Sequence, residues 1–146
     1  MTLEWKSSVL AQYVVDRIKL QTPSVFDTVF YGDQDRIPGG LILCVEPDKR
    51  TRELSGAPRK VAIDVDLYLL VYINKLLDSE AARKMADEVV EGLEEFLHTD
   101  PQMNGQVIHN MVTNTESGYS NKGNTLIRTS RITLSIQSQQ FLPLAQ

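Results

Sequence analysis

Residues 60–73 read KVAIDVDLYLLVYI, and this stretch decides the fold. Apolar residues occupy almost every second position from 61 to 73, while Asp64 and Asp66 fall between them. This alternation predicts a β-strand with one buried face and one face that carries two carboxylates. At about 3.3 Å per residue the strand would extend on the order of 40 Å, which is more than a small core needs. We therefore expect it to bend or to project beyond its own domain.

The segment that follows predicts the clearest helix of the chain. Residues 79–98 place apolar side chains at helical spacing, and Asp78 can cap the first turn. A second helix is expected over residues 3–20, with Thr2 as its cap. Further strands are expected over residues 25–31, 41–45, 106–116 and 125–139, with Leu126, Ile132, Leu134 and Ile136 on one face of the last, and polar loops over residues 47–60 and 117–124.

The order of these elements predicts the fold class. One helix, three strands, a second helix and two strands indicate an α+β protein, with a mostly antiparallel sheet of about four to five strands packed against two helices. The 146 residues fit a single domain over residues 1–146, with an arm at residues 140–146. No leader-like segment opens the chain, and no apolar run is long enough to span a bilayer. We expect a cytosolic protein that does not contact membranes.

Charge and motifs argue against several functions. The formal net charge is −4, which disfavours a dedicated nucleic-acid binder but allows a protein past which DNA slides without being gripped. No phosphate-binding glycine motif and no G-x-S-x-G motif is present. We therefore expect no enzyme activity and no cofactor.

Cysteine and histidine offer little chemistry. Cys44 lies within an apolar run and is expected to be a buried thiol. His98 is expected to act as a cation at the end of a helix, and His109 as a half-exposed strand residue. These three scattered residues fall short of the four ligands of a structural zinc site, so we expect no metal.

Asp64 and Asp66 are the strongest candidates for chemistry. Two positions apart on a strand, they project from the same face and could hold a divalent cation or share acid–base work. The alternative is a solvated strand face, with Arg128 or Arg131 opposite them on a neighbouring strand. The second interpretation is favoured because no further acidic residue lies close by in the sequence.

A basic segment is the other candidate surface. Lys49, Arg50, Arg52, Arg59 and Lys60 fall within the predicted loop of residues 47–60 of an acidic chain. They could contact an acidic partner or phosphates, or they could belong to a solvated connector. The sequence leaves both interpretations open.

The whole chain resembles the tail terminator (tail completion) proteins of long-tailed bacteriophages. The resemblance rests on the opening helix, the order of the elements and several local phrases, which are VEP at residues 45–47, KVAIDVDLYLLVYI at 60–73, ARKMAD at 82–87 and HTDP at 98–101. It covers nearly all of the chain, and it includes no catalytic motif.

The resemblance implies a structural protein of the virion neck, assembled in the host cytoplasm. Such proteins form a ring, usually of six subunits, that caps the tail tube, ends its elongation and docks the head-completion or connector protein. The ring can also touch a sheath protein, and DNA passes through its lumen without specific binding. Alternatives are another neck or head-completion protein, a small metal-dependent enzyme or ligand-binding domain that uses Asp64 and Asp66, and an intracellular adaptor.

The resemblance also locates the expected contacts. The ring interface would be built from the strand at residues 61–73 and the closing strands, with the basic segment against an acidic patch on a neighbouring protein. The apolar segment that begins with Phe141 and Leu142 would serve as an arm onto an adjacent subunit.

Overall fold

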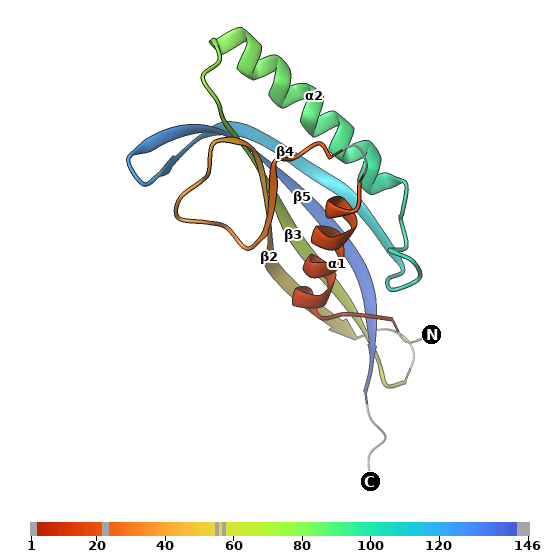
Figure 1. Cartoon of the computed structure of the whole chain (residues 1–146). Helices are drawn as coiled ribbons and strands as arrows, with labels where there is room; N and C mark the ends of the chain where they lie inside the picture. The colour runs from red at the N-terminus through yellow and green to blue at the C-terminus, as the bar shows by residue number, and fades with distance from the viewer. Residues whose placement is uncertain (1–2, 22–23, 55, 57, 143–146) are drawn as a thin grey trace.

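The computed structural model describes residues 3–21, 24–54, 56 and 58–142. Two helices and five strands make up the fold (Figure 1). They are α1 (Ser7–Lys19), β1 (Thr28–Tyr31), β2 (Gly40–Leu54), β3 (Lys60–Asn74), α2 (Ser79–His98), β4 (His109–Lys122) and β5 (Thr125–Phe141). The predicted α+β class is confirmed. None of the described helices is long and apolar enough to cross a membrane.

The five strands form one sheet in the order β1-β2-β3-β5-β4, and every neighbouring pair except β1 and β2 is antiparallel. Residues 60–73 lie in the central strand β3, which pairs along its whole length with β2 on one side and β5 on the other. The predicted strand is therefore confirmed, but it has no free edge for pairing with another subunit.

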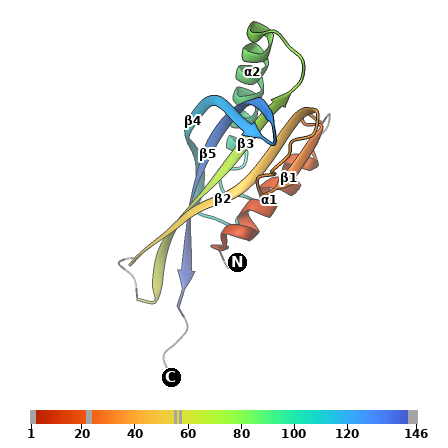
Figure 2. The same cartoon turned by 90° about the vertical axis from the view of Figure 1, so that its left-hand side faces the viewer.

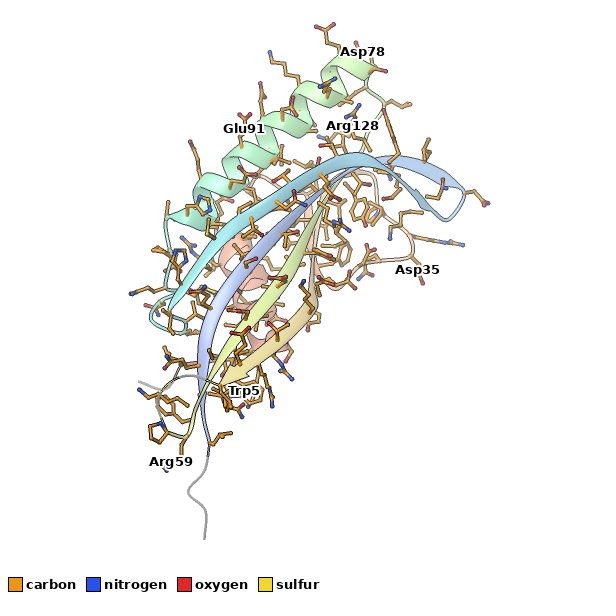
Figure 3. All side chains as sticks on the ribbon, turned by 180° about the vertical axis from the view of Figure 1, so that it is seen from behind. Trp5, Asp35, Arg59, Asp78, Glu91 and Arg128 are labelled. Carbon is orange, nitrogen blue, oxygen red and sulfur yellow. The ribbon has the colours of Figure 1, made fainter. Side chains whose placement is uncertain are left out.

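Both helices pack on the same face of the sheet, called here the covered face. Its core contains the apolar residues of β3 that alternate from Val61 to Ile73, together with apolar residues of both helices and of β2 and β5. The opposite, open face is seen from the front in Figure 3. The predicted helix at 79–98 and its cap are confirmed, since the Asp78 carboxylate accepts a hydrogen bond from the Ala81 N–H at 2.7 Å.

A loop of residues 32–39 covers one end of the open face. It connects β1 to β2, which run parallel although parallel neighbours usually need a connection of a dozen or more residues. The four-residue length of β1 makes the short return feasible. Ile37 of this loop packs on the sheet in a second, smaller apolar cluster, whose other members are Ile42, Cys44, Leu70, Tyr72 and Ile127.

The two predicted polar loops are wrong. Most of residues 47–60 continue β2 and begin β3, so they form a long hairpin, and residues 117–122 continue β4 to a two-residue turn at Gly123 and Asn124. Among the described strands, β2 has no outer neighbour beyond Val45 and β4 forms the opposite edge, so both segments are mostly exposed and no apolar alternation marks them. Pro47 is tolerated because β1 pairs with β2 only as far as Val45, and a bulge follows in the register.

Two smaller expectations also need correction. Helix α1 starts at Ser7, because residues before it are extended and Glu4 donates its N–H to the Gln106 carbonyl at 2.6 Å. The expected cap Thr2 lies outside the described residues. Leu126 was expected to share the buried face with Ile132 but is 64% exposed.

Candidate interaction surfaces

The basic segment is split between the two faces of the β2–β3 hairpin. Arg50 and Arg52 pair with core residues of β3 and lie on the covered face, where their guanidinium groups stack 4.9 and 5.1 Å from the centroid of the Trp5 ring. Lys49 lies on the open face, with its Nζ atom 3.9 Å from a carboxylate oxygen of Asp66. The segment is therefore no continuous basic loop, because strand alternation and the bulge separate its cations.

The remaining cations lie at the end of the hairpin, next to the end of β5. Figures 2 and 3 show this end projecting beyond the body of the sheet, with Arg59 labelled at its tip. The Leu142 N–H donates to the Arg59 carbonyl at 2.7 Å, and the Lys60 ammonium lies 5.4 Å from the centroid of the Phe141 ring. We call the set of Leu54, Arg59, Lys60, Phe141 and Leu142 the hairpin end. It combines exposed apolar side chains with cations.

Asp64 and Asp66 do project from the same, open face, as expected. Asp64 is exposed and lies in register with Gln137, whereas Asp66 accepts a hydrogen bond from the Ser135 hydroxyl at 2.9 Å. Their expected neighbours are wrong. Arg128 pairs with Ile73 and Arg131 with Leu70, both farther along β3.

Arg131 is instead held by other groups of the open face. Its guanidinium lies 4.6 Å from the centroid of the Tyr68 ring and donates to a Glu116 carboxylate oxygen at 2.6 Å. Because Arg131 pairs with Leu70, six residues along β3 from Asp64, it does not lie opposite either carboxylate.

The open face is acidic as a whole. On its strands, six carboxylates outnumber four cations, with Glu46, Asp48, Glu53, Asp64, Asp66 and Glu116 against Lys49, Lys60, Lys122 and Arg131. Within the described part of the chain, no three histidine, cysteine or carboxylate residues cluster as metal ligands would. The face thus offers a spread of negative charge rather than a focused cation site.

Asp33 fastens the loop of residues 32–39 to the sheet. Its carboxylate accepts a hydrogen bond from the Tyr72 hydroxyl and another from the Lys122 ammonium, each at 2.7 Å. Burial by itself would raise the pKa of Asp33, but the hydrogen bonds from Lys122 and Tyr72 and the charge of Lys122 together lower it. The small cluster on the open face is therefore closed by a charged, hydrogen-bonded contact.

The cysteine and histidines have structural settings. Cys44 is fully buried, and burial raises the pKa of its thiol to about 12, as the sequence analysis expected of an inert thiol. His98 ends α2, as expected, and its Nε2 atom accepts the Val112 N–H at 3.1 Å. His109 begins β4 and is exposed rather than half-exposed.

The sequence does not predict a groove between the segment that follows α1 and the middle of α2, called here the α1–α2 groove. Its volume is 220 Å³, and it is lined by Gln21, Val25, Phe26, Glu88, Val89, Gly92 and Leu93. The one sequence signal was Gly92, because a glycine inside a helix costs about 1 kcal/mol relative to alanine. A Cβ atom added there meets no described atom outside the helix backbone within 4 Å, so packing against the described part of the chain does not require this glycine.

Comparison with known proteins adds no relative. The chain matches no model of a known protein family and no curated protein sequence.

Proposed function

We propose that this chain is a structural phage protein, a tail terminator whose ring caps the tail tube, ends its elongation and joins it to the head connector. The observation that carries the proposal is the one-sided sheet. Both helices cover one face, while the other face stays largely open, long and acidic. Such a surface suits assembly with other proteins better than it suits catalysis.

The edges of the sheet favour assembly into a ring. Strand β1 pairs only with residues 42–45 of β2, so the outer edge of β2 is open from Glu46 onward. Strand β4 forms the opposite edge. An open edge can pair with another chain. Two different edges on one subunit suit a head-to-tail contact, which closes into a ring when the rotation allows it.

The charge of the open face suits a lumen that DNA traverses. Negative charge repels the phosphate backbone, so DNA would pass without specific binding. In this arrangement the tail tube protein would contact one rim of the ring and the head-completion or connector protein the other. A sheath protein would contact the outer surface in a contractile tail.

Native mass spectrometry over a range of protein concentrations tests the proposal first. A discrete closed oligomer, with six subunits expected, should form either alone or when purified tail tubes are added, and it should stop further tube growth. A chain that stays monomeric in both conditions and leaves tube elongation unchanged would refute the proposal. Electron microscopy of labelled particles would distinguish a terminator at the tail end from a neighbouring neck protein.

A further inference from the structure

The groove between α1 and α2 has the size and chemistry to take an aromatic side chain. Its 220 Å³ volume exceeds the roughly 150 Å³ that holds benzene in a buried protein cavity. Apolar residues such as Val25, Phe26 and Val89 line it, and Val25 is 45% exposed. A ring that entered the groove would bury this apolar surface.

Gly92 gives an independent sign that something approaches α2 at the groove. Glycine disfavours a helix, and at this position no described atom outside the helix backbone would touch a Cβ. Glycine allows another group to come close to the backbone of a helix. Among the described residues outside α2, no atom comes within 4 Å of a Cβ at this position, so a partner's side chain can approach the backbone here.

The helical wall of the groove is acidic. Between Asp87 and Glu95, α2 carries five carboxylates and no cation. Glu88 itself lines the groove, and Glu95 is exposed two turns farther along the helix. A group that enters this groove should therefore be apolar at its centre and positively charged at its rim.

The hairpin end has this combination of properties. Phe141 is 54% exposed and Leu54 89% exposed, while Lys60 lies over the Phe141 ring and Arg59 sits beside them at the tip. Within the described part of the chain, the Arg59 guanidinium has no carboxylate within ion-pair distance. The hairpin end and the groove are therefore complementary in both polarity and charge.

The two surfaces cannot meet within one chain. Figures 1 and 2 both place α2 and the hairpin end at separate parts of the molecule, and Figure 3 labels Arg59 and Glu91 far apart. A contact between them must join two copies. Because the two surfaces differ, the contact is head-to-tail, which is the type that closes into rings.

We infer that the hairpin end of one copy docks into the α1–α2 groove of the next, with the Phe141 ring over Gly92 and with Arg59 and Lys60 facing Glu88 and Glu95. This contact rests on the proposed ring, for which it supplies the interface between subunits. It acts beside the open edges of β2 and β4, whereas the strand at 61–73 has no free edge to offer a neighbouring subunit.

The variants Gly92→Met and Phe141→Ala test the contact. Native mass spectrometry should show that each raises the concentration of half-assembly by at least about tenfold, as expected when a central interface anchor is lost or blocked. The Tm of Gly92→Met should be unchanged or higher, because methionine is the better helix former and the site is open. Matched controls are Ala81→Met, exposed on the same helix, and Leu126→Ala, exposed at the opposite hairpin.

The outcomes separate this contact from the proposed function. Wild-type-like assembly of Gly92→Met and of Phe141→Ala would overturn the contact, while a ring that still caps tubes would leave the function standing. Loss of assembly in these variants together with a wild-type ring that caps no tube would support the contact and refute the function. If Gly92→Met lowered the Tm, Phe141→Ala would decide, since it changes only an exposed side chain. A wild type that remained monomeric under all conditions would overturn both.

Discussion

The two faces of the sheet differ in the interactions that cover them. The covered face buries apolar residues of both helices and four strands in one continuous core. The open face buries a cluster of six residues that includes one from a loop, and that loop is fastened by the hydrogen bonds of Asp33. Hydrophobic burial provides most of the free energy of folding. The covered face therefore stabilises the chain, and most of the open face remains available for contacts.

The largest loss of stability is expected when a core side chain of β3 is removed. Leu67 is fully buried on the covered face, so Leu67→Ala should lower the free energy of unfolding by about 3 kcal/mol through lost burial and a cavity. Chemical denaturation measures the change. The matched control is Gln137→Ala, exposed on the open face, for which we expect a change within about 0.5 kcal/mol. Equal losses would show that the open face is also a core.

A smaller loss of stability should follow from Asp33→Asn, which weakens the contact of the loop of residues 32–39 with Tyr72 and Lys122. We expect a loss of about 1 kcal/mol at neutral pH, because the carboxylate is still partly in contact with solvent. Since the pKa of Asp33 is lowered in the folded protein, its stabilisation is present above the ordinary carboxyl pKa of about 3.9.

That stabilisation should disappear as the pH falls from about 4 through the lowered pKa. The difference in stability between wild type and Asp33→Asn should therefore shrink in this range, as measured by denaturation at several pH values. Asp35→Asn, on the same loop, is the control and should show no such convergence. A difference that stayed constant down to pH 2 would contradict the role of the Asp33 charge.

The smallest effect is expected at Asp64. Because Asp64 is exposed on the open face, Asp64→Asn should change the free energy of unfolding by less than about 0.5 kcal/mol. Magnesium or calcium should leave the Tm of the wild type unchanged. If these cations raised the Tm and Asp64→Asn removed the rise, the metal-dependent alternative would be favoured. The open face would then bind cations as well as repel DNA.

The fate of the basic segment shows how far local patterns reach. Its five cations are evident in the sequence, yet they were assigned to a loop because polar residues without alternation resemble a connector. Beyond Val45, where β2 forms an edge of the sheet, neither face needs to be apolar, so the same composition forms a strand. The residue types of the candidate surface were thus predictable, whereas the faces on which they lie were not.

The sequence by itself determined β3, α2 and the α+β class, because a strand buried on one face and a helix packed on a core must show their periods in the order of apolar residues. Asp78 likewise marked the start of α2, because its carboxylate can accept a hydrogen bond from a free N–H of the first turn. Only the tertiary structure decided that Arg50 and Arg52 stack on Trp5, that Arg131 binds Glu116, and that Gly92 faces a groove. These facts depend on sheet order, on a bulge and on helix placement, which are set by contacts between residues far apart in the chain.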